Sequence, residues 1–262
     1  RVDIRSKRTR DVFRTQPIDA LVHLGLMHDP RRSNRTHHQW NVVGTQHLLE
    51  YCLHYRVPKV VVVSSSAVYG PRPENPQFLT EDAPLLAAQD DPSALSLVEA
   101  DMLANSFFWK YREGETVILR PVHILGQVAN AASNYLRMER IPVLMGYDPM
   151  MQVIHEADVV DAVCAALEPG VRGIYNVVGP GEVPISVLIK EAGRPTFPIP
   201  HFAAPMVSKL FWNLGAAPFR GTELNHLRYV CMVDGARART DLGFRATRTI
   251  KEAVHAALDD TY

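Results

Sequence analysis

The segment from Lys59 to Ser64 constrains the fold more than any other, because four consecutive valines follow the lysine. β-Branched residues favour strands, and in a strand these valines point alternately to both faces. A strand that is apolar on both faces belongs in the middle of a parallel sheet that is covered by helices. Parallel strands need crossover connections, so we expect a helix before this strand and another after it.

The surrounding sequence alternates between strand and helix patterns. Expected strands lie at residues 18–25, 59–64 and 116–120, and expected helices lie at residues 34–54 and 93–111. After Gly126 the expected elements are short: a helix at residues 156–167, a strand at 173–178 and two helices between 234 and 258.

This alternation predicts an α/β fold with a Rossmann-like, doubly wound parallel sheet. We expect residues 1–125, with parts of 150–178, to form the sheet domain. Residues 126–262 are expected to form mainly a smaller carboxyl-terminal lobe that binds substrate.

The composition is that of an ordinary globular protein. Of the 262 residues, 28 are basic and 28 are acidic, and a net charge of zero gives no reason to expect a nucleic-acid partner. No apolar run reaches the roughly 20 residues that a membrane span needs. The cysteines Cys52, Cys164 and Cys231 lie far apart in apolar surroundings, which favours reduced core thiols and a cytoplasmic protein. Because the chain starts with Arg1 and close to a strand, we also expect a preceding segment.

The ends of the expected strands carry the candidate binding residues, because ligands of doubly wound sheets bind at the carboxyl ends of the strands. Gly25 follows the first strand and would let a ligand approach the backbone closely. Ser64, Ser65 and Ser66 follow the second strand with three hydroxyl groups. The sequence has no clustered histidine and carboxylate pattern of a metal site, so we expect no metal.

Seven short motifs occur in an order that spans most of the chain. They are His23–Gly25, Asn41–Thr45, Ser64–Gly70, Leu119–Pro121, Gln152–Asp158, Tyr175–Gly179 and Ala236–Phe244. Together they resemble the NAD-dependent epimerase/dehydratase family of the extended short-chain dehydrogenases/reductases. The resemblance implies NAD or NADP as the cofactor, with NAD slightly favoured. It also implies a homodimer that pairs through residues 34–54 and 93–111.

The resemblance further implies roles for individual residues. Ser65 matches the catalytic serine or threonine that hydrogen-bonds the substrate during hydride transfer. The implied cofactor contacts are Leu24, Gly25, Asn41, Ser64, Pro121, Val122 and His123, and the implied substrate contacts are Tyr69, Asn134, Gln152 and His155. From their positions after the expected strands, His28 is a further candidate for the cofactor and Ser66 for the substrate. Gln152 stands where the family usually has arginine, so a nucleoside diphosphate loses a cationic contact and an apolar ligand would be tolerated.

Two features of the family are missing from this sequence. The Tyr-x-x-x-Lys pair of the active site is replaced by Ser93 and Leu97, which cannot act as a phenol held near neutral pKa by an ammonium group. The glycine-rich turn that opens the nucleotide-binding β-α-β unit is not present in the chain shown, so the residue that selects NAD or NADP is not present either.

Three functions are therefore compatible with the sequence. The first is an NAD(P)-dependent, epimerase/dehydratase-like oxidoreductase that uses Ser65 with a different proton donor on an unknown substrate. The second is a catalytically inactive pseudoenzyme that binds a dinucleotide or serves as a scaffold. The third is an interaction module that binds no cofactor. Dinucleotide binding separates the third from the other two, and hydride transfer separates the first from the second.

Overall fold

The computed structural model describes residues 3–6, 8–27, 32–91, 94–128, 130–204, 206 and 225–259. The first half contains α1 (Arg8–Thr15), β1 (Ala20–His23), α2 (Asn34–His37), η1 (His38–Gly44), α3 (Thr45–His54), β2 (Lys59–Val63), η2 (Ser66–Val68), α4 (Ala87–Asp90), α5 (Leu95–Lys110) and β3 (Glu115–Pro121). The second half contains β4 (His123–Leu125), α6 (Ala131–Arg137), β5 (Ile141–Leu144), β6 (Met150–His155), α7 (Glu156–Leu167), β7 (Gly173–Val177), β8 (Glu182–Pro184), α8 (Ile185–Glu191), β9 (Thr196–Ile199), α10 (Ala236–Asp241) and α11 (Ile250–Leu258). Within the described ranges, no helix combines the length and the apolar character that crossing a membrane requires.

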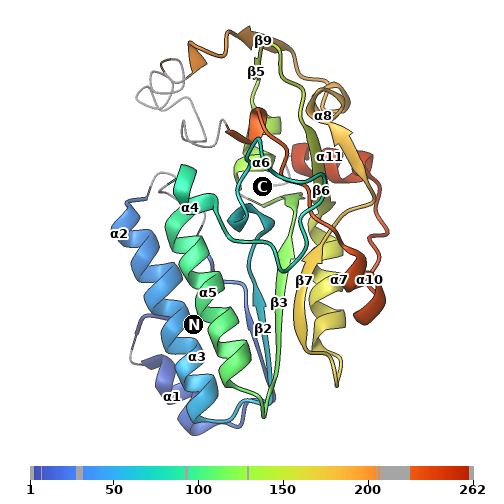
Figure 1. The fold of residues 1–262 in the computed structure, drawn as a ribbon. Helices are drawn as coiled ribbons and strands as arrows, with labels where there is room; N and C mark the ends of the chain where they lie inside the picture. The colour runs from blue at the N-terminus through green and yellow to red at the C-terminus, as the bar shows by residue number, and fades with distance from the viewer. Residues whose placement is uncertain are drawn as a thin grey trace.

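Four parallel strands form the central sheet, in the order β1-β2-β3-β7 (Figure 1). Val61 of β2 pairs with Val22 of β1 on one side and with Val117 of β3 on the other. β2 therefore lies inside the sheet, and Val60, Val61 and Val62 are no more than 1% exposed. The predicted parallel α/β architecture is confirmed.

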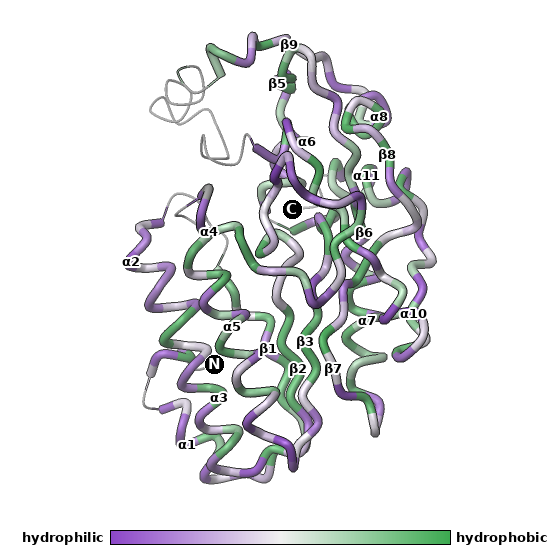
Figure 2. The backbone as a smooth tube through the Cα atoms, viewed as in Figure 1, coloured by the Kyte–Doolittle hydropathy of each residue, from purple (hydrophilic) through white to green (hydrophobic). Residues whose placement is uncertain are grey.

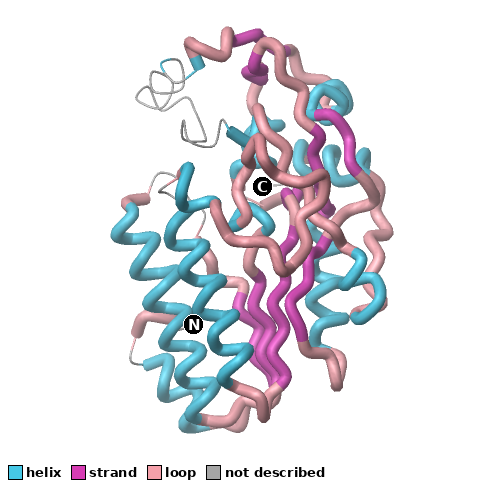
Figure 3. Tube along the Cα trace, in the orientation of Figure 1, coloured by secondary structure: helices cyan, strands magenta, loops and turns pink. Residues whose placement is uncertain are grey.

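Helices cover both faces of this sheet (Figure 3). On one face, Val60 and Ile118 belong to a buried apolar cluster with Phe107 of α5. On the other face, Val61 belongs to a cluster with Ala162 of α7. Successive valines of β2 thus enter opposite cores, as the two-residue period of a strand requires.

A second apolar core lies in the smaller lobe. This lobe contains the sheet β4-β6-β8 and the strand pair β5-β9, together with α6, α8 and α11. Ile141, Leu188 and Val254 come from three of these elements and belong to one buried cluster. In Figure 2, apolar stretches run through the central strands and through this lobe. The division of the chain at residue 125 stays a prediction.

The helix predicted at residues 34–54 is continuous but changes its winding. Between α2 and α3, the seven residues of η1 follow π-helical winding. This wider segment contains Asn41, whose side chain is fully buried. π-Helical turns are frequent at functional sites, because they place a side chain where a regular helix would not. The short helix α4 was not predicted, and α5 begins two residues later than expected.

The three cysteines are free thiols in different surroundings. Cys52 is buried and Cys231 is half-buried, and burial raises the pKa of each thiol to about 12. The expected core position was wrong for Cys164, which is exposed. It lies between the buried Ala162 and Ala166, on the side of α7 that turns away from the sheet. A cytoplasmic location stays a prediction.

Candidate functional site

The loop after β1 is held by two side chains of η1. Asn41 Oδ1 accepts a hydrogen bond from Met27 N at 2.6 Å, and Asn41 Nδ2 donates to Met27 O at 3.0 Å. Trp40 Nε1 donates to Gly25 O. These bonds fix the backbone beside Leu24, whose side chain is 65% exposed after the carboxyl end of β1. The expected cofactor contacts Leu24, Gly25 and Asn41 thus lie close together, although the Asn41 amide is already committed to the loop.

The three serines after β2 occupy different environments. Ser64 is buried, and its hydroxyl donates to Asp101 Oδ2 at 2.6 Å. Ser66 is buried in η2. Ser65 is the most exposed of the three, and its Oγ accepts a hydrogen bond from Ala67 N at 3.2 Å. Because an accepted bond leaves the hydroxyl proton free, Ser65 retains a donor for a ligand.

Asp101 is at the centre of a buried ion pair. Arg120 Nε donates to Asp101 Oδ2 at 2.9 Å and Arg120 Nη2 donates to Oδ1 at 2.6 Å, between side chains that are no more than 1% exposed. Arg120 Nη1 donates to the Tyr69 hydroxyl at 2.8 Å, which in turn donates to Asn176 Oδ1 at 2.9 Å. Burial raises the pKa of Tyr69 to about 12. Tyr69 is therefore a neutral core residue, and this placement argues against the expected substrate contact.

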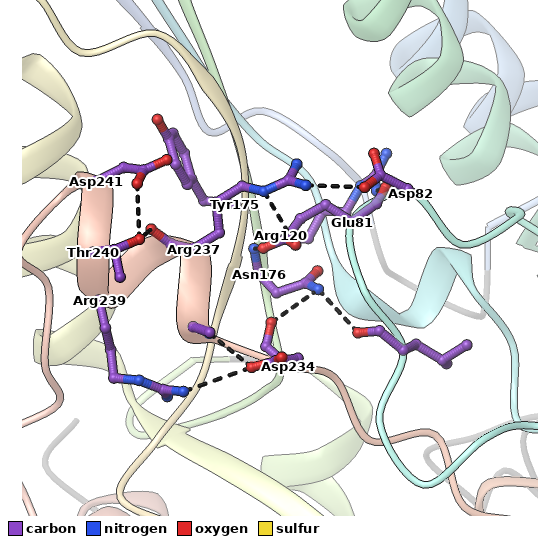
Figure 4. Close-up of polar contacts among 12 residues, drawn as sticks. Glu81, Asp82, Arg120, Tyr175, Asn176, Asp234, Arg237, Arg239, Thr240 and Asp241 are labelled. Atoms are coloured by element: carbon purple, nitrogen blue, oxygen red, sulfur yellow. Dashed lines mark hydrogen bonds and ion pairs between the residues drawn. The ribbon is translucent and has the colours of Figure 1, made fainter.

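The network continues to the carboxyl-terminal helix α10. Asn176 N donates to Glu81 Oε1 at 2.9 Å, and Asn176 Nδ2 donates to Asp234 O at 3.2 Å. Figure 4 shows Arg237 of α10 extending toward the carboxylates of this loop, and its Nη2 donates to Asp82 Oδ2 at 2.9 Å. The loop with both carboxylates is thus tied to β7 and to α10.

Leu97, at the predicted lysine position, has apolar surroundings. Leu97 of α5 is half-buried and packs against the apolar cluster that contains Val68 and Val98. Ser93, at the predicted tyrosine position, and His28, an expected cofactor contact, lie outside the described residues. At the predicted lysine position the side chain is therefore apolar.

The expected cofactor contacts Pro121, Val122 and His123 lie where β3 is followed by β4. Pro121 and Val122 are buried, and Val122 N donates to Val177 O at 3.0 Å. The ring of His123 lies 5.4 Å from the ring of His226 in an edge-to-face contact. Burial lowers the pKa of His123 to about 4, and burial together with His123 lowers the pKa of His226 to about 3. Both rings are uncharged at neutral pH, so they offer hydrogen bonds to a ligand but no positive charge.

The expected substrate contacts in the smaller lobe make internal hydrogen bonds. Gln152 Oε1 accepts from Val233 N at 2.8 Å, and Gln152 Nε2 donates to Val233 O at 3.1 Å. His155 Nδ1 accepts a backbone N–H and caps α7. Asn134 Oδ1 accepts from Arg137 Nη1 at 3.2 Å. The buried Gln152 holds the carboxyl-terminal segment in place, while Asn134 and His155 are half-buried.

Sequence reasoning missed Asp101 and Asn176, which complete the network around Arg120. Asp101 lies three residues from both Val98 and Ala104 and so shares the apolar side of a helix with them. A carboxylate in that position requires a buried cationic partner, which was the available signal. Among the residues that the structure describes, no three histidine, cysteine or carboxylate side chains are grouped to bind a metal ion.

Comparison with known proteins finds one matching family model and several related sequences. The model of the NAD dependent epimerase/dehydratase family matches residues 1–178. Uncharacterized proteins of Mycobacterium tuberculosis and Mycobacterium bovis are each 26% identical to this chain over 257 residues, which cover 97% of this chain and 68% of theirs.

Solved structures share the fold. UDP-glucuronic acid 4-epimerase from Bacillus cereus, in complex with UDP-glucuronic acid and NAD, has a TM-score of 0.75 at 18% identity and is matched over 99% of this chain and 79% of that chain. RMD from Pseudomonas aeruginosa, complexed with NADPH, has a TM-score of 0.72 at 22% identity, over 98% of this chain and 86% of that chain. dTDP-glucose 4,6-dehydratase from Bacillus anthracis, in complex with NAD, has a TM-score of 0.73 at 17% identity. The match covers 98% of this chain and 77% of that chain. Because the family match covers 178 of 262 residues, this chain belongs to the NAD-dependent epimerase/dehydratase family.

Proposed function

We propose that this chain binds a nicotinamide dinucleotide at the carboxyl edge of β1, β2 and β3 and has lost the proton relay of the family. The observation that supports this proposal is Leu97, a half-buried apolar residue at the predicted position of the lysine, whose ammonium group would lower the pKa of a phenol. Tyr69 does not replace that phenol, because it is buried with a pKa of about 12. Loss of a positioned proton donor slows such a reaction by roughly 10² to 10⁴-fold.

The residues at this edge fit the nicotinamide end of a dinucleotide. Leu24 offers exposed apolar surface, and the bonds from Asn41 and Trp40 fix the backbone beside it. A fixed apolar surface of this kind suits a flat ring, because little conformational freedom is lost on binding. A dinucleotide bound there would supply the hydride chemistry. The chain shown has no glycine-rich turn to hold the pyrophosphate. The complexes of UDP-glucuronic acid 4-epimerase with NAD and of RMD with NADPH support this class of cofactor.

A slow oxidoreductase is the second candidate function, and Ser65 favours it. Ser65 lies half-buried after β2 and keeps a hydroxyl proton for a ligand. A hydrogen bond from this hydroxyl would polarise a substrate carbonyl group. Epimerase/dehydratase-like chemistry on an unknown substrate would then draw its proton from solvent or from the substrate.

Calorimetric titration with NADH and NADPH tests the proposal. We expect micromolar binding of at least one of them, and Leu24→Asp should weaken it about tenfold or more because a carboxylate would repel the anionic dinucleotide. Val12→Asp, at a position 42% exposed on α1, is the matched control and should leave binding unchanged. A folded protein that binds neither cofactor would contradict the proposal and favour an interaction module. If the unchanged protein catalyses hydride exchange and Ser65→Ala abolishes it, the oxidoreductase function is established instead.

We also propose a homodimer that forms through α5. Leu95, Met102 and Trp109 are spaced seven residues apart and are 48%, 56% and 62% exposed. Residues at this spacing lie on one side of a helix, so a stripe of large apolar side chains runs along α5. Phe107, by contrast, is buried in the core. An exposed apolar stripe of this kind is typical of a surface that a partner covers.

Sedimentation equilibrium tests the dimer. The unchanged protein should be a dimer at micromolar concentration, and Trp109→Glu should raise the dissociation constant about tenfold or more, because aromatic anchors dominate such interfaces. Val160→Glu, at a position 60% exposed on α7, is the control and should remain dimeric. A monomeric unchanged protein would rule the interface out.

A further inference from the structure

A cavity of about 400 Å³ lies in the smaller lobe. Apolar side chains from β5 and α8 form much of its wall, including Val143, Leu144, Ile185 and Ile189. Leu227, from the segment that precedes α10, also lines it. A cavity of this volume with mainly apolar walls is within the range of small-molecule sites.

Two cations line the same cavity. Lys190 lies near the end of α8, and Arg194 follows it by four residues. Arg194 Nε is buried, and no described residue accepts a hydrogen bond from it. A buried charged N–H without an acceptor is unfavourable, so this group favours a ligand that brings an acceptor into the cavity.

The lining residues carry a net charge of +1. Asp148 is the one carboxylate among them, against Lys190 and Arg194. Its two oxygens are occupied by a single residue, since Oδ1 accepts from Ser186 N at 3.0 Å and Oδ2 accepts from Ser186 Oγ at 2.7 Å. Asp148 is thus bonded to Ser186, and the two cations outnumber it among the lining residues.

Other polar side chains of the smaller lobe differ in whether their hydrogen bonds are already made. Arg137 of α6 donates to three backbone carbonyl oxygens, at 2.7, 3.0 and 2.8 Å. Gln152 exchanges both of its bonds with the backbone of Val233. Arg228, by contrast, lies over the ring of the lining residue Tyr147, and its buried Nε has no acceptor among the described residues, so it adds to the positive charge near the cavity.

We propose that this cavity binds a small molecule with an apolar body and one anionic group, a carboxylate or a phosphate monoester, held by Lys190 and Arg194. Leu227 of the cavity wall directly follows His226, whose ring contacts His123 at the start of β4. The segment that lines the cavity thus also contacts the residues that follow β3. The proposal rests on the proposed function only where it treats this molecule as the substrate that meets the dinucleotide at the carboxyl edge of the sheet.

Calorimetry with 2-naphthoate, 2-naphthyl phosphate and the uncharged 2-naphthamide tests the proposal on the unmodified chain without dinucleotide. We expect at least one of the two anions to bind about tenfold or more tightly than the amide, as for the loss of a charge-assisted hydrogen bond. The two anions distinguish a carboxylate from a phosphate. The double variant Lys190→Met, Arg194→Met should bring the affinity for the anion down to that for the amide. Lys110→Met, an exposed lysine at the end of α5, should change nothing.

Equal binding of the anions and the amide, or binding of neither anion to a folded protein, would overturn the proposal. Tighter binding of uridine diphosphate than of either naphthyl anion would overturn it in favour of a nucleoside diphosphate. Titration of the double variant with NADH keeps the two proposals apart. If the double variant no longer binds the anion but still binds NADH, the anion site is in this cavity and is separate from the dinucleotide site. If the unmodified chain binds the anion but not NADH, the proposed function fails and the anion proposal stands.

Discussion

Replacing Asp101 with alanine is expected to lower the free energy of unfolding by about 3–5 kcal/mol, the usual cost of removing one partner from a buried ion pair. The Arg120 guanidinium makes two hydrogen bonds to this carboxylate, and neither side chain is more than 1% exposed. Without Asp101, Arg120 would keep a charge that water cannot reach, and Ser64 Oγ would lose its acceptor at 2.6 Å. Urea denaturation followed by circular dichroism measures the change.

Two further variants separate charge burial from simple truncation. The double variant Asp101→Leu, Arg120→Met removes both charges, so it should be more stable than Asp101→Ala despite carrying more changes. Asp82→Ala removes a carboxylate that is 79% exposed and pairs with Arg237, and we expect a loss of no more than about 0.5 kcal/mol. If Asp101→Ala cost no more than Asp82→Ala, the buried network would not hold the serine turn and α5 together as we argue.

The central sheet could be predicted because its signal is local. Four valines in succession require burial on both faces wherever the strand lies, and the structure places them against two separate cores. The predicted helix at residues 156–167 matches α7 for the same reason, since its apolar residues recur at helical spacing within a few turns. Such patterns do not depend on which distant residue packs against them.

The candidate site could be predicted only in part because its contacts are distant in sequence. Asp101 and Arg120 are 19 residues apart and meet only when α5 packs over β3. Gln152 and Val233 are 81 residues apart, so the sequence near Gln152 does not reveal that its amide is already occupied. The motif around Tyr69 predicted a substrate contact, but whether the phenol enters the core depends on Asn176 of β7.

Helix α5 carries both a residue of the buried ion pair and the residue at the predicted lysine position. Leu97 lies one helical turn before Asp101, and the two side chains make different kinds of contact. Asp101 binds Arg120 and Ser64, which stabilises the end of the sheet. Leu97 packs into the adjacent apolar cluster, where an ammonium group would have to be desolvated. Leu97→Lys is therefore expected to lower the stability of the fold.

Gly179→Ala is expected to cost about 3 kcal/mol or more of unfolding free energy, because the added methyl group has no space. A Cβ atom on Gly179 would lie 1.8 Å from the carbonyl oxygen of Val153, which belongs to β6. A backbone carbonyl cannot rotate away as a side chain can, so β6 itself would have to shift. Gly235→Ala is the matched control, since its Cβ would meet the Val178 Cγ2 methyl at 2.4 Å and that side chain can move; we expect a loss of about 1 kcal/mol. Thermal unfolding of both variants measures the difference. Similar losses of unfolding free energy in the two variants would show that the close approach of Gly179 to β6 does not limit stability.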